Sequence, residues 1–385
     1  MTLSEQLDRL AAFEATPYPV VSLYLNTQPD SHGKDRFQTF VRKEFKARAR
    51  TFPQNSPERD SLDRDLERIS RYLETQVNPA SNGVALFACA AADLFDVVQL
   101  AAPIDQHWLS IGDRPHLYPL ARLESQSPLY AAVLADTNSS RILVFSGAQL
   151  LNQQQIAGVK TRRGDEGGWS AKRFQRHVEN FHLHHVKDLM DALERVVRHE
   201  GITQILIAGD EVVTPLLREQ MPKHLAERVV DHVRIPSHAP LHDVIRLSLD
   251  AMAHVNDRTD RDKVEMAIAE YRAGGLGVVG PDDTLDALVK GQVDELLLDA
   301  SLRNLKHLPG TPAVRTQVLG TNVRNEAAAA TAVAGEAADA NAESVRIADA
   351  LVTRARQTAA TITFIEDPNL LEDYGGVAAL LRFRI

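Results

Sequence analysis

The segment from Lys160 to Arg176 combines glycines, cations and a helix start in a way that suits contact with an anionic target. Gly167 and Gly168 are adjacent, and glycine allows backbone angles and close approaches that other residues cannot adopt. A helical pattern opens after them at Ser170, and a first helical turn offers unpaired N–H groups that favour negative charge. We predict that this segment binds phosphates, together with the cations that flank the glycines: Lys160, Arg162, Arg163, Lys172, Arg173 and Arg176.

A second cationic run extends from Lys34 to Arg50 and holds seven lysines and arginines against two acidic residues. A solvated helix face would explain either run taken alone, and the formal net charge of −9 does not by itself indicate nucleic-acid binding. Two such runs in one acidic chain favour phosphate contact. The predicted RNA-binding residues of the second run are Arg42, Lys43, Lys46, Arg48 and Arg50.

The loop and the helix after it resemble a known family. Gly-Gly-Trp-Ser-Ala-Lys-Arg-Phe-Gln-Arg is similar to the signature of archaeal and eukaryotic class-1 translation release factors, Gly-Gly-Gln followed by Ser-Ala-Leu-Arg-Phe-Ala-Arg. The order of elements along the chain resembles the three-domain plan of release factors and Pelota, above all the bacterial branch that includes Balon-like ribosome hibernation factors. The matching positions are Gly167, Gly168, Ser170, Ala171, Arg173, Phe174 and Arg176.

Trp169 replaces the family's glutamine at the loop tip, so that the candidate tip reads Gly167, Gly168 and Trp169. In the family, the glutamine side chain helps to place water and its backbone N–H stabilises oxyanion charge. An indole has one donor and no acceptor, but it can stack on a nucleobase for about 1–3 kcal/mol. The substitution favours docking over hydrolysis, and we assign no firm catalytic residue. The alternative is a tryptophan that packs the loop back onto its own domain.

The pattern of elements predicts an α/β (α+β) protein with three domains, each a mixed sheet with flanking helices. The first domain, residues 1–125, contains an apolar strand, two helices and two further strands, and lacks a recognisable stop-codon-reading tetrapeptide. Its predicted elements are a strand over 19–26, helices over 37–50 and 57–73 with Ser56 as cap, and strands over 84–90 and 94–101.

The middle domain, residues 127–255, carries the glycine-tipped loop before a long helix that ends at Gly201. The third domain, residues 258–385, resembles kink-turn-binding ribosomal proteins and includes an alanine-rich insertion at about 303–342. The middle domain's predicted elements are a hairpin of 130–136 and 141–145, helices over 170–199 and 211–220, and a strand over 202–208. Those of the third domain are helices over 263–271, 284–290 and 342–359, strands over 278–279, 295–298 and 362–365, and a final strand or helix-strand over 377–383.

Other patterns give no site. His182 and His185 share a helix face, but no cysteine or recurring acidic ligand accompanies them, so we predict surface histidines and no metal. The spacing Gly275-x-Gly277-x-x-Gly280 fits a dinucleotide fingerprint but follows a helical segment, so we predict a turn with a short strand and no cofactor. Cys89 lies in an apolar run that predicts a buried thiol, and a single cysteine fits a reducing cytoplasm. No apolar run is long enough to span a membrane.

The resemblance implies a protein that binds the ribosomal A site without decoding stop codons, most simply a hibernation or stress-protection factor. Its partners would be ribosomal RNA, P-site tRNA and a translational GTPase such as elongation factor Tu. One alternative is a peptidyl-tRNA hydrolase that rescues stalled ribosomes through Gly167 and Gly168. A second alternative is an RNA- or tRNA-binding module unrelated to the ribosome.

Overall fold

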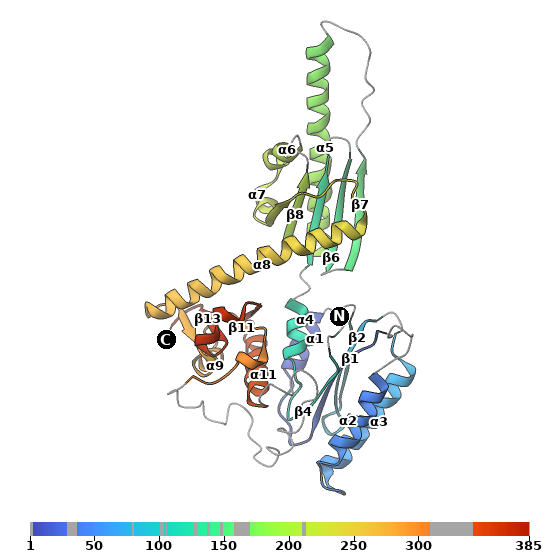
Figure 1. Ribbon diagram of the computed structural model, residues 1–385, viewed down its shortest axis with the longest axis vertical. Helices are drawn as coiled ribbons and strands as arrows, with labels where there is room; N and C mark the ends of the chain where they lie inside the picture. Colours follow the sequence, from blue (N-terminus) through green and yellow to red (C-terminus); the bar gives the residue numbers. More distant parts are fainter. Residues whose placement is uncertain are drawn as a thin grey trace. The chain divides into compact units, whose positions relative to one another are not determined.

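The computed structural model describes residues 3–28, 37–78, 81–100, 104, 106–125, 129–136, 139–146, 149–157, 170–209, 213–308 and 342–384. Contacts divide the chain into two units. One unit joins Met1–Ser125 to Asp260–Ile385, and the other is Gln126–Thr259. The α/β class predicted from the sequence is confirmed, because helices flank each of the three sheets (Figure 1). The boundaries of the three predicted domains are not tested by this division and stay predictions.

The first sheet of the larger unit is antiparallel, with the strand order β3-β2-β1-β4. Because side chains alternate along a strand, Leu23 and Leu25 of β1 point to one face and Tyr24 to the other. Helices α2 and α3 cover the Leu23 face, and α1 and α4 cover the Tyr24 face. The elements are α1 (Leu3–Ala11), β1 (Val20–Asn26), α2 (Phe37–Ala49), α3 (Pro57–Thr75), β2 (Gly83–Cys89), β3 (Leu94–Leu100), β4 (Trp108–Gly112) and α4 (Tyr118–Ser125).

The second sheet of this unit has the order β10-β13-β11-β12, with β11 and β12 parallel and the other pairs antiparallel. Leu296 and Leu298 of β11 pack under α9 and α11. Leu297 faces the opposite side, where Val264 of α8 is buried. The elements are α8 (Leu241–Arg272), β10 (Gly277–Val279), α9 (Pro281–Val289), β11 (Val293–Asp299), α11 (Ala342–Gln357), β12 (Thr361–Ile365) and β13 (Val377–Leu381).

The smaller unit holds a five-stranded sheet of order β7-β6-β5-β8-β9, with β5, β8 and β9 parallel and β6 and β7 antiparallel to their neighbours. Leu189 and Leu193 of α5 pack on one face, and Val244 and Met252 of α8 pack on the other. The elements are β5 (Leu129–Ala135), β6 (Ser139–Ser146), β7 (Gln149–Ala157), α5 (Ser170–Glu200), β8 (Gln204–Gly209), α6 (Val213–Gln220), α7 (Lys223–Ala226) and β9 (Val229–Val233).

Most predicted elements are confirmed within a few residues, and two of their end signals are seen directly. Ser56 caps α3 by accepting the Arg59 backbone N–H at 3.1 Å, and Gly201 ends α5 with φ at 69°. The helix predicted over 263–271 is too short, because α8 begins at Leu241. No element predicted from the sequence corresponds to β4, β7, β9, α1, α4 or α7. Most of the predicted insertion lies outside the described residues, which leave out 309–341.

Candidate nucleic-acid interface

Helix α2 presents the exposed cations of the second basic run. Its buried residues Phe37, Val41, Phe45 and Ala49 recur every four positions and pack beneath the helix. This spacing leaves the remaining faces to solvent. The exposed cations on those faces and directly after the helix are Arg42, Lys43, Lys46 and Arg50.

Arg48 differs from these four cations because its side chain is only 9% exposed. It lies seven residues after Val41, on the buried side of α2, and its Nη2 is 3.4 Å from Glu44 Oε2. Burial lowers the pKa of Arg48, and the nearby Glu44 carboxylate opposes that shift. We therefore leave Arg48 out of the proposed contact surface.

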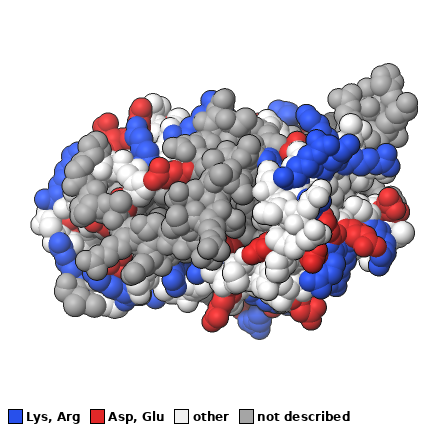
Figure 2. Space-filling model, turned by 90° about the horizontal axis from the view of Figure 1, so that it is seen from below, with Lys and Arg blue, Asp and Glu red and all other residues white. Residues whose placement is uncertain are grey.

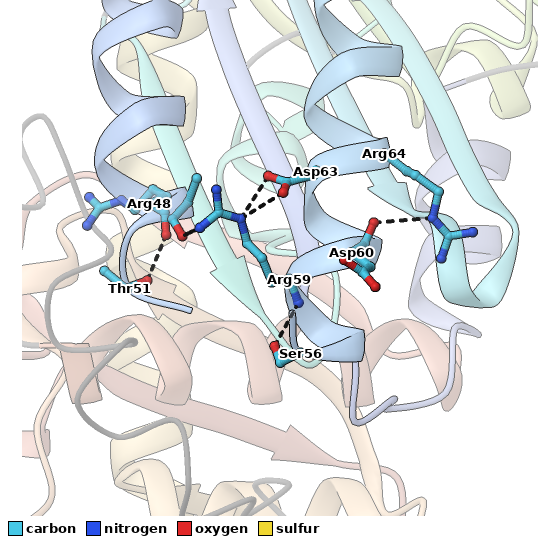
Figure 3. A network of polar contacts seen from close by, with 8 residues as sticks. Arg48, Thr51, Ser56, Arg59, Asp60, Asp63 and Arg64 are labelled. Carbon is cyan, nitrogen blue, oxygen red and sulfur yellow. Dashed lines mark hydrogen bonds and ion pairs between the residues drawn. The ribbon is translucent and has the colours of Figure 1, made fainter. Parts of the chain in front are cut away.

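Figure 3 shows how the tip between α2 and α3 is held. Arg59 Nε donates to both carboxylate oxygens of Asp63, at 2.9 and 2.8 Å, and its Nη1 donates to the Ala49 carbonyl at the end of α2. Thr51 Oγ1 donates to the Arg48 carbonyl at 2.8 Å. These bonds fix the tip while Arg50 stays exposed. Arg59 is not among the residues predicted from the sequence, although an arginine four residues before an aspartate in a helix indicates such a pair.

Asp65 fixes the other side of α3 to the sheet. Its side chain is buried, and its Oδ2 accepts the Ala90 N–H at 2.9 Å, while Ser61 Oγ accepts the Ala91 N–H at 3.1 Å. Burial raises the pKa of Asp65 to about 6, against the Ala90 hydrogen bond, which lowers it. Cys89, just before this turn, is buried, as the sequence predicted.

The first basic run is largely outside the described residues. Those residues leave out Lys160, Arg162, Arg163, Gly167, Gly168 and Trp169. The backbone of α5 begins at Ser170, where the sequence predicts a helix start. Lys172, Arg173 and Arg176 therefore lie on the first turns of a helix, and their side chains are not described.

Figure 2 shows Lys and Arg side chains interspersed with Asp and Glu over one face of the protein. Among the described residues on that face, positive charge forms local groups rather than one continuous surface. A local group such as that on α2 can hold a few phosphates at short range, because exposed charges more than about 10 Å apart are largely screened at 0.1 M salt.

The histidines of α5 do not form one surface. His185 is buried, and its Nε2 lies 2.9 Å from Ser140 Oγ, so the prediction of a surface histidine is wrong there; the i, i+4 spacing to Leu189 places both on the buried face. His199 is exposed. Within the described ranges, no group of three or more His, Cys, Asp and Glu residues could hold a metal ion.

The glycines of the fingerprint-like spacing serve packing and turning. A Cβ at Gly277 would lie 2.2 Å from the Ala267 carbonyl oxygen, so β10 approaches α8 too closely for any side chain. Gly280 has φ at 85° and precedes α9. The predicted turn and short strand are confirmed. In the part of the chain that the structure describes, no helix is long and apolar enough to cross a bilayer.

Comparison with known proteins finds similarity to translation release factors. The family model "Bacterial archaeo-eukaryotic release factor family 10" matches residues 115–253. Peptide chain release factor subunit 1 of Thermoplasma acidophilum is 20% identical over 397 aligned residues, covering 98% of this chain and 94% of the relative. Eukaryotic peptide chain release factor subunit 1 of Stylonychia mytilus is 23% identical over 299 residues, covering 74% and 67%.

Among solved structures, Dom34 of S. cerevisiae, a translation termination-like factor, is 11% identical with a TM-score of 0.41, and the alignment covers 78% of this chain and 80% of Dom34. The chain is thus similar to peptide chain release factors along nearly its whole length. The family-model match over residues 115–253 is to a bacterial family of archaeo-eukaryotic release factors.

Proposed function

We propose that this protein binds the ribosomal A site as a release-factor-like factor that does not decode stop codons. The observation that carries the proposal is similarity to peptide chain release factor subunit 1 along 98% of this chain. The first region supports it, because exposed cations lie along α2 and directly after it, where Arg59 holds the turn to α3.

The composition of the tip favours phosphate contact over base reading. Lysine and arginine contacts to phosphates position a protein on nucleic acid and carry little sequence information. Phe52, the aromatic residue between α2 and α3, is buried and therefore not available to stack on a base. A factor with such a tip holds ribosomal RNA at the decoding centre whatever codon is present.

Trp169 supports a blocking role at the peptidyl-transferase centre. An indole N–H can donate but cannot accept a hydrogen bond from the attacking water. A factor that occupies the decoding centre and places a weak or inactive Gly-Gly-Trp loop in the peptidyl-transferase centre protects an idle ribosome. This is a hibernation or stress-protection role in the cytoplasm. The third region would contact a translational GTPase such as elongation factor Tu, and the tip loop would lie near P-site tRNA.

The second candidate is a peptidyl-tRNA hydrolase that rescues stalled ribosomes. The adjacent Gly167 and Gly168 favour it, since the family's backbone donors are kept in the sequence. Co-sedimentation with ribosomes, with and without peptidyl-tRNA, separates the candidates when release of labelled peptide is scored in the same samples. Binding without release supports the blocking factor. Release that Gly168→Ala abolishes supports the hydrolase, and absence of binding contradicts both.

A further inference from the structure

The larger unit joins a first region, residues 1–125, to a third region, residues 260–385, and the two share one hydrophobic core. Helices α1 and α4 contribute Leu7, Leu10 and Leu120, and helix α11 contributes Leu351 and Val352 to the same buried cluster. Each of these helices also packs on the sheet of its own region. Helices of the two regions therefore contribute to one continuous buried cluster.

Asp349 joins the two helical layers by polar contacts. Its Oδ2 lies 2.6 Å from Nδ1 of the buried His116, and its Oδ1 accepts the backbone N–H groups of Leu117 at 3.0 Å and Tyr118 at 3.2 Å. Leu117 and Tyr118 lie at the start of α4, where N–H groups have no partner within the helix. A carboxylate from the third region thus stabilises the N-terminus of a helix in the first region.

Arg356 makes a second connection near the C-terminal end of α11. Its guanidinium pairs with Glu124 of α4, lies 3.6 Å from Asp8 Oδ1 of α1, and donates to Ser4 Oγ at 3.1 Å. The neighbouring Gln357 donates to the Ala11 carbonyl at 2.7 Å. Burial lowers the pKa of Arg356, and Asp8 opposes the shift.

We infer that residues 1–125 and 260–385 form one rigid body, latched by Asp349 and Arg356 across a shared core. Domains of one chain ordinarily move relative to each other unless their interface is large and hydrophobic. Here the buried cluster is continuous with both cores, and Arg356 faces the oppositely charged Glu124 and Asp8. The α2–α3 tip is then fixed relative to the surface of the third region. This inference does not depend on the ribosome as target.

The test is a distance distribution in the full-length protein. Spin labels are placed at two exposed positions, Glu74→Cys in α3 and Asp373→Cys in the third region, in a Cys89→Ala background that removes the only native thiol. Double electron–electron resonance on this otherwise native chain should give a single narrow distance peak. A broad distribution would overturn the inference without any further variant.

The latch is tested by Asp349→Ala combined with Arg356→Ala in the same labelled chain. We expect loss of the narrow peak while circular dichroism shows that helices and strands are kept. Arg354→Ala is the matched control, since Arg354 lies on the same helix and donates to Gln357 of that helix at 2.8 Å. A peak that the double variant leaves as narrow as the control does would show that Asp349 and Arg356 are not the latch.

Discussion

The exposed cations on α2 and directly after it give the sharpest quantitative prediction. We consider replacement of Arg42, Lys43, Lys46 and Arg50 by glutamine, which removes four exposed positive charges and leaves the buried face of α2 intact. Each phosphate contact on a single strand contributes about 0.7 to the slope of log affinity against log salt, so four contacts contribute about 3. Between 50 and 200 mM salt, the wild type should therefore lose about 50-fold more ribosome affinity than the variant.

The assay is fluorescence anisotropy or co-sedimentation of purified protein with ribosomes over this range of salt. The matched control replaces by glutamine four exposed cations that each pair with an acidic residue four positions away: Arg71, Arg198, Lys223 and Lys290. Both variants lower the net charge by the same amount, so general electrostatic repulsion is equal. If the slope of log affinity against log salt were unchanged in the α2 variant, or changed equally in the control, contact through the cations of α2 would be refuted.

Three further predictions follow from single residues. Asp65→Asn should remove a pH dependence of stability. The pKa of Asp65 in the folded protein is about 6, above the usual 3.8, so the wild type loses on the order of 3 kcal/mol of unfolding free energy as pH rises from about 4 to above 6. Urea unfolding of the variant across this range should show no such loss. Ser56→Ala should destabilise the protein by about 1 kcal/mol in urea unfolding through loss of the α3 cap, and an unchanged midpoint would contradict the cap. Trp169→Gln should gain release of labelled peptide from programmed ribosomes; strong release by the wild type would instead favour the hydrolase.

Local signals account for what the sequence predicted well. The cap at Ser56, the β5–β6 hairpin and the glycine end of α5 each depend on residues a few positions apart. The exclusion of Arg48 from the exposed cations was also available from spacing, since it lies seven residues after Val41 on the apolar side of α2.

Other features depend on contacts that no local pattern shows. The first half of α8 has a polar residue, Ser248, on its buried side, and this residue is tolerated because its hydroxyl lies 2.9 Å from the Tyr130 hydroxyl of β5. A polar residue on the buried face interrupts the apolar periodicity from which the first half of α8 could have been predicted. The pair of His116 and Asp349 joins residues 233 positions apart, so neither residue indicates its role from its own neighbours.

The central claim is occupation of the A site without codon reading. The most direct test measures the affinity of the labelled protein for ribosomes whose A site is empty, programmed with a stop codon or a sense codon, or filled with tRNA. A base-reading factor should discriminate about tenfold or more, since a good bidentate base contact contributes about 1–3 kcal/mol. We predict equal affinity for the empty, stop and sense states and loss of binding when tRNA fills the site. A tenfold preference for stop codons, or undiminished binding beside A-site tRNA, would contradict the account.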